Sequence, residues 1–117
     1  MATVTSETGN CYSYALSVLA GVPEENGVRV RKFTEQMSDL GYVESTKEEA
    51  EVVLKVDENG IPYHVAIVVE LRADGNHLLK HRFGFGFPVE LVLLNELTPR
   101  DPNHFFKFYK KPTFAHF

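Results

Sequence analysis

The chain has 117 residues, a formal net charge of −4, 44% hydrophobic residues and 24% charged residues. This length leaves room for a single domain over residues 1–117 with one core, and the ordinary composition argues against intrinsic disorder. The acidic balance argues against a nucleic-acid partner, and no apolar run approaches the roughly 20 residues that a membrane-spanning helix needs.

Two helices are predicted in the first third of the chain. The first spans residues 10–21, where Asn10 is a favourable N-cap and Gly21 a favourable stop. The second spans residues 30–40, where apolar residues recur at intervals of three and four, the spacing of one helix face. The polar residues 1–9 before them are expected to form a flexible arm.

The pattern changes to strands after residue 50. Val-rich and alternating segments predict five strands, at residues 51–56, 63–71, 77–83, 88–94 and 104–110. Helices followed by a meander of antiparallel strands indicate an α+β domain, with the helices packed on a mostly antiparallel five-stranded sheet. The aromatic segment 104–117 is expected to supply an edge strand and its packing tail, or alternatively an oligomer contact.

Cys11 is the only cysteine, which excludes an internal disulfide and a multi-cysteine zinc site. It is predicted in the first turn of a helix, where unpaired N–H groups and the helix dipole stabilise a thiolate and lower the thiol pKa. A thiolate is the nucleophile that covalent catalysis needs. The alternative is a buried structural cysteine.

Three histidines of the predicted sheet are candidates for this chemistry. His64 opens an apolar strand, where it is either a core residue or an imidazole held rigidly against the helix N-terminus. His77 and His81 lie in the next strand, and a regular strand would point both to the same side. Either one could hydrogen-bond His64 and fix its tautomer.

The order of these features resembles the compact papain-like cysteine peptidases of the NlpC/P60 and CHAP type. The matching residues are Asn10-Cys11 before a helix, then His64-Val-Ala-Ile, then a glycine turn and a strand that ends in His81. The resemblance covers roughly residues 9–95. It implies a papain-like core in which Cys11 is the nucleophile, His64 the base and His81 the orienting residue, with His77 as the alternate.

The resemblance also implies a reaction, the hydrolysis of an amide through a thioester. Cys11 would attack the carbonyl, and His64 would protonate the leaving amine and then activate water. The Cys11 backbone N–H would contribute to an oxyanion hole, with the Asn10 side chain as a further donor. The implied substrates are peptide or isopeptide amides, including fragments of bacterial peptidoglycan.

Aromatic residues near these positions are the expected substrate contacts. Tyr12 and Tyr63 adjoin the candidate cysteine and histidine. Phe83 and Phe85 belong to a segment, RFGFGFP, that lacks the context of a phosphate loop and forms either a bulged strand or an aromatic lip. A non-catalytic module of the same fold that binds a peptide or a protein partner is therefore the alternative function.

No metal or cofactor is expected, although the imidazoles of His64, His77 and His81 and the thiol of Cys11 are ligand types that suit zinc. The first residues have no basic start followed by an apolar stretch, which argues against a secretory signal. The protein is therefore expected to be cytoplasmic as synthesised, with export by a route that needs no signal peptide as the alternative.

Overall fold

The computed structural model describes residues 10–25, 27–84 and 87–112. These residues form two α-helices, two short 3₁₀ helices and one antiparallel sheet of six strands. The predicted α+β class is confirmed, and the predicted five strands are corrected to six. The arm expected at residues 1–9 lies outside the described residues.

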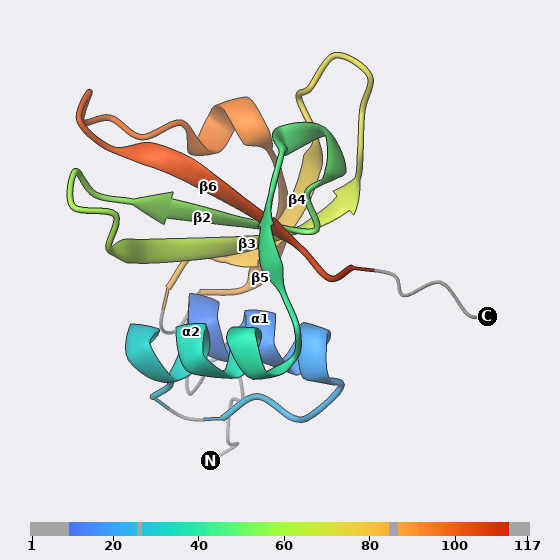
Figure 1. The fold of residues 1–117 in the computed structure, drawn as a ribbon, viewed down its shortest axis with the longest axis vertical. Helices are drawn as coiled ribbons and strands as arrows, with labels where there is room; N and C mark the ends of the chain where they lie inside the picture. The colour runs from blue at the N-terminus through green and yellow to red at the C-terminus, as the bar shows by residue number, and fades with distance from the viewer. Residues whose placement is uncertain (1–9, 26, 85–86, 113–117) are drawn as a thin grey trace.

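The first helix, α1, spans Cys11–Ala20 (Figure 1). A reciprocal capping box starts it: Asn10 Oδ1 accepts the Ser13 N–H at 2.8 Å, and Ser13 Oγ accepts the Asn10 N–H at 2.6 Å. Gly21 ends the helix at φ 69°, a left-handed conformation that glycine adopts without strain. Both predicted ends of this helix are confirmed.

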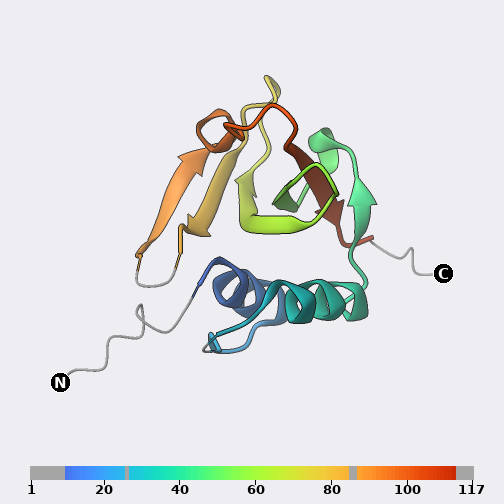
Figure 2. The same ribbon diagram turned by 90° about the vertical axis from the view of Figure 1, so that its left-hand side faces the viewer.

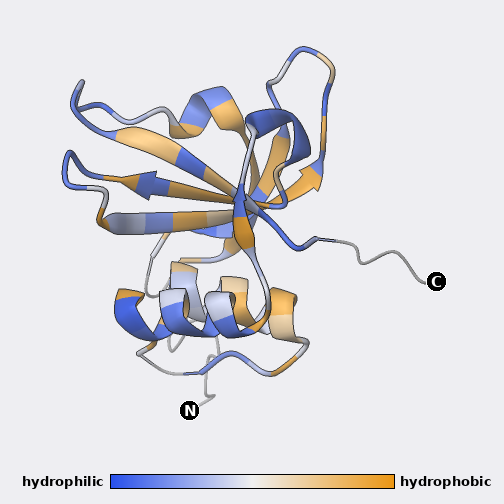
Figure 3. Ribbon diagram, in the orientation of Figure 1, coloured by the Kyte–Doolittle hydropathy of each residue, from blue (hydrophilic) through white to orange (hydrophobic). Residues whose placement is uncertain are grey.

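The second helix, α2, spans Val30–Asp39 and is strongly amphipathic. It buries Phe33 and Met37 against the sheet side, while its outward residues are mostly hydrophilic (Figure 3). Neither helix within the described residues is long and apolar enough to cross a membrane.

The sheet has the strand order β1-β6-β2-β3-β4-β5. Its strands are β1 (Val43–Ser45), β2 (Val52–Val56), β3 (Pro62–Glu70), β4 (Leu78–Arg82), β5 (Val89–Leu93) and β6 (Phe105–Lys110). The 3₁₀ helix η2 (Lys47–Glu49) precedes β2, and η3 (Leu94–Leu97) follows β5.

Strand β1 is absent from the sequence prediction because its three residues show no alternation of buried and exposed positions. It exists through its pairing with β6, in which Val43 lies opposite Lys110. Because β6 also pairs with β2, it is an interior strand, and the prediction of an edge strand at 104–110 is wrong.

A hydrophobic core lies on each face of the sheet. Both helices lie on one side of it, where α1 and α2 cover residues such as Val65 and Ile67 of β3 (Figure 2). On the other face, Ala66 of β3 packs with Leu79 and with the apolar residues of η3. Alternate side chains of β3 thus pack into the two cores, which agrees with the two apolar sides predicted for this strand.

Candidate functional site

Strands β3 and β4 bring two of the candidate histidines together. His64 Nε2 lies 2.7 Å from His81 Nδ1, and the two rings meet edge to face with centroids 5.0 Å apart. Both side chains are buried. The register of β3 against β4, with Val68 opposite Leu79, places both imidazoles on the same face of the sheet. His81 therefore holds the position that an orienting residue needs.

His77, the alternate orienting residue, lies elsewhere. It precedes the first residue of β4, so the alternation that would align it with His81 does not extend to it. Its Nδ1 accepts the Arg72 N–H at 2.9 Å, and its Nε2 donates to the Lys47 carbonyl at 3.0 Å. Both ring nitrogens are thus occupied in holding the β3–β4 turn against η2.

Cys11 is the first residue of α1, and its side chain is buried. Burial raises the pKa of its thiol to about 11, although the backbone N–H groups of Val65, Tyr12 and Cys11 itself act in the opposite direction. The helix N-terminus thus favours the thiolate as expected, but desolvation is the larger effect. The expectation of a lowered thiol pKa is therefore wrong for this state of the protein.

The thiol lies beside the backbone of Val65, the residue that follows His64. No hydrogen bond joins the Cys11 Sγ to an imidazole among the residues that the structure describes. Burial, with smaller effects of His81 and Lys55, lowers the pKa of His64 to about 3. Cys11 belongs with Val65 to the core on the helix side of the sheet, whereas His64 shares the face of Ala66. The neutral thiol and the neutral imidazole therefore lie on opposite faces of β3.

Two residues that flank Cys11 serve as structural ties. Asn10 uses both side-chain atoms, because Oδ1 accepts from Ser13 and Nδ2 donates to the Val28 carbonyl at 2.8 Å. One N–H of this amide is therefore engaged in the tie to Val28. The Tyr12 hydroxyl donates to the Pro62 carbonyl at 3.2 Å, which connects the start of α1 to the start of β3.

An open cavity of about 450 Å³ lies next to Phe83, which separates it from the histidine pair, and none of Cys11, His64 and His81 lines it. Tyr63 and Phe83, both expected substrate contacts, line it together with Lys55 and Arg100. The Phe83 side chain is 56% exposed, and its ring centroid lies 6.1 Å from that of His64 and 6.1 Å from that of His81. Phe85, the other expected contact in this segment, lies outside the described residues.

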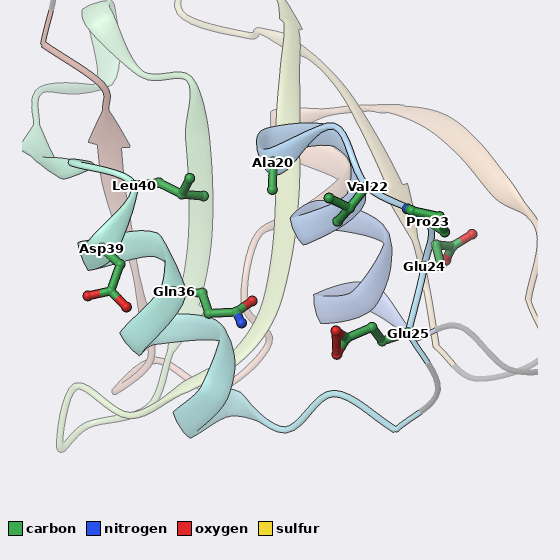
Figure 4. A pocket seen from close by; sticks show the side chains of 8 residues that line it. All are labelled: Ala20, Val22, Pro23, Glu24, Glu25, Gln36, Asp39 and Leu40. Atoms are coloured by element: carbon green, nitrogen blue, oxygen red, sulfur yellow. The ribbon is translucent and has the colours of Figure 1, made fainter.

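A second cavity, of about 540 Å³, lies between the end of α1 and α2 (Figure 4). Val22 and Leu40 form part of its apolar wall, and the carboxylates of Glu25 and Asp39 lie at its rim. Neither Cys11 nor a histidine lines it. This larger cavity therefore does not belong to the cysteine–histidine site.

One group of side chains in the described residues has the donor types of a metal site. His104 Nε2 lies 3.6 Å from a carboxylate oxygen of Glu58 and 3.6 Å from one of Asp101. His104 Nδ1 lies 3.1 Å from the Tyr63 hydroxyl. These contacts join the β2–β3 turn to the loop before β6, which gives the cluster a structural role.

Two residues near the histidine pair were not identified from the sequence. Glu90 on β5 lies directly opposite His81, with Oε1 3.9 Å from His81 Nε2. Arg82 is buried and forms a two-pronged ion pair with Glu24, at 2.8 and 3.1 Å, which connects the end of β4 to the loop after α1. Strand register brings these groups together, and no local motif indicates register across a long loop.

The buried histidine pair is expected to make the protein sensitive to mild acid. Because the pKa of His64 is depressed to about 3, the unfolded chain binds a proton there below about pH 6.5 that the folded protein does not bind. The free energy of unfolding should thus decrease as the pH is lowered below about 6.5, by about 1.4 kcal/mol per pH unit for one such group. The stability that the neutral His64 contributes is fully present above its pKa in the unfolded chain. It is lost as the pH falls towards its pKa in the folded protein.

Urea unfolding between about pH 7 and about pH 5 measures this slope. His64→Asn removes the titrating group, so its stability should fall less steeply over the same range. If the free energies of unfolding of the wild type and the variant changed equally with pH, the depressed pKa of His64 would be contradicted.

Comparisons of this chain with protein-family models, with curated proteins and with solved structures find no match.

Proposed function

We propose that this protein is a cysteine hydrolase with a papain-like core that cleaves a peptide or isopeptide amide. Cys11 is the nucleophile, His64 the general base and His81 the residue that orients His64. The observation that carries the proposal is the 2.7 Å contact between His64 Nε2 and His81 Nδ1. It is the contact between a base and its orienting residue that nucleophilic catalysis needs.

Helix α1 brings the thiol to the strand of His64 but to its opposite face, so catalysis would require the imidazole to turn towards the helix side. This helix packs against β3 and β4, the two strands that carry the histidines, and its first residue is the only cysteine of the chain. The thiol lies at the backbone next to His64, and free N–H groups of the first helical turn surround it. A developing oxyanion next to Cys11 would meet the Cys11 backbone N–H, with the second N–H of the Asn10 amide as a further donor.

The environments of the two groups indicate how such a hydrolase would be activated. With a thiol pKa of about 11 and an imidazole pKa of about 3, the proton stays on sulfur in the resting protein. The proton would move to His64 as the sulfur attacks an electrophilic carbon, in the reaction the carbonyl carbon of the substrate. His64 then returns this proton to the leaving amine, and it takes a proton from the water that hydrolyses the thioester.

The open cavity next to Phe83 is the natural place for the substrate. Tyr63 and Phe83 offer aromatic surface, and Lys55 lies with its Nζ 5.6 Å from the Tyr63 ring centroid. The exposed Phe83 ring covers the edge of both imidazoles. Displacement of this ring by a substrate would open a path to His64.

The burial of Cys11 favours a second candidate function, a peptide- or protein-binding module. A thiol with a pKa of about 11 and no hydrogen bond to a histidine is typical of a structural cysteine. In this case the cavity lined by Tyr63 and Phe83 binds its partner without chemistry, and the histidine pair is part of the core.

Alkylation of Cys11 by iodoacetamide distinguishes the two functions, because the chain has no other thiol. For the hydrolase, we expect labelling of the native protein between about pH 6 and about pH 8 that is at least about tenfold faster than in His64→Ala, because the imidazole removes the thiol proton. Mass spectrometry follows the rate of adduct formation.

His104→Ala, which changes a histidine outside the pair, is the matched control and should label at the wild-type rate. Labelling that begins only near the thiol pKa of about 11, at equal rates in the wild type and His64→Ala, would reject the hydrolase. The same result would support the binding module.

A further inference from the structure

One buried polar atom in the described part of the chain has no hydrogen-bond partner, and it is His81 Nε2. A buried polar group left without a partner costs about 1–3 kcal/mol, so proteins rarely keep one unless a partner is close by. The atom belongs to an imidazole that is 1% exposed. A partner for it has to come from the residues that line this face of the sheet.

Glu90 is placed to be that partner. It lies directly opposite His81 in the β4–β5 register, and its Oε1 is 3.9 Å from His81 Nε2. The Glu90 side chain is 54% exposed, so a rotation of its torsions meets little obstruction and shortens this distance to that of a hydrogen bond. The other titratable groups that face His81 are His64, which contacts Nδ1, and Lys55, which is a cation and cannot accept.

A hydrogen-bond acceptor next to His81 Nε2 determines which ring nitrogen carries the proton in His81 and in His64. Burial lowers the pKa of both imidazoles, so each carries one ring proton at neutral pH. If His81 donates its proton from Nε2 to Glu90, its Nδ1 is an acceptor. His64 must then donate from Nε2 to His81, and His64 Nδ1 is left with a lone pair.

We propose that Glu90 is a positioning residue that sets the tautomer of His64 through His81 and so leaves His64 Nδ1 free to accept a proton. The assignment of the protons depends only on the three side chains. The use of Nδ1 as the general base rests in addition on the proposed hydrolase function. Glu90 touches neither the thiol nor the cavity beside Phe83 in this arrangement.

Two-bond proton–nitrogen NMR correlation spectra of the ¹⁵N-histidine-labelled protein report the protonated nitrogen of each ring. In the wild type at neutral pH, we expect both His64 and His81 to carry the proton on Nε2. Glu90→Leu removes the acceptor, so a second population with the proton on Nδ1 should appear in both rings together. Glu90→Gln keeps a side-chain oxygen acceptor and should restore the wild-type pattern.

Glu44→Leu, which removes an exposed carboxylate from β1, is the control and should leave both patterns unchanged. A wild-type His81 protonated on Nδ1, or unchanged patterns in Glu90→Leu, would overturn the assignment. The tautomer readout does not need activity, so it can succeed in a protein whose Cys11 is unreactive. In that outcome Glu90 keeps its role and only the hydrolase fails.

Discussion

Replacing Cys11 by alanine is expected to abolish amide hydrolysis while leaving the fold in place. The nucleophile of a thioester mechanism has no substitute in this chain, because Cys11 is its only thiol. Loss of a covalent nucleophile typically lowers turnover by at least about a thousandfold. The change removes one sulfur atom from a buried position, so its effect on stability should be about 1 kcal/mol.

The measurement is a mass-spectrometric screen for new termini in a mixture of synthetic peptides, isopeptides and peptidoglycan fragments. Ser17→Ala is the matched control, because it changes a polar side chain of the same helix that bonds only within the helix. This control should keep the wild-type product pattern. Equal product formation by the wild type and Cys11→Ala would exclude Cys11 as the nucleophile.

Replacing Phe33 by alanine is expected to cost about 3–5 kcal/mol of unfolding free energy, the range for a buried phenylalanine. Phe33 has no exposed surface and lies in the core between the helices and the sheet. Its ring centroid lies 5.3 Å from that of Tyr12, the residue after Cys11. A cavity here would therefore loosen the start of α1 as well as weaken the core.

Urea unfolding of the two proteins measures this loss, which is a large part of the 5–15 kcal/mol that stabilises a typical domain. Phe105→Ala is the matched control, since this phenylalanine is 43% exposed on β6 and should lose less than about 1 kcal/mol. Equal losses at the two positions would contradict the burial of Phe33 and the packing of α2 on α1.

The site combines features that favour catalysis with features that oppose it. Backbone N–H groups favour a thiolate at Cys11, but burial raises the thiol pKa and lowers the pKa of His64. Both effects of burial keep the Cys11 thiol and the His64 imidazole neutral. The hydrolase also requires His64 to reach the thiol from the opposite face of β3, whereas a binding module needs no such rearrangement.

Local signals in the sequence determined the helices and most strands. Asn10 and Gly21 mark the ends of α1 because capping and left-handed glycine depend on neighbours within four residues. The alternation along β3 likewise predicted a strand with two different faces. The choice of Cys11, His64 and His81 as candidates also came from local context, since each lies at the start or end of a predicted element.

Only the tertiary structure decided how distant segments meet. The position of β6 between β1 and β2, the separation of His77 from the pair and the approach of Glu90 to His81 all depend on strand register. Register arises from the packing of whole faces against the two cores, and no short motif encodes it. The raised pKa of Cys11 has the same origin, because desolvation depends on what the whole fold places over the thiol.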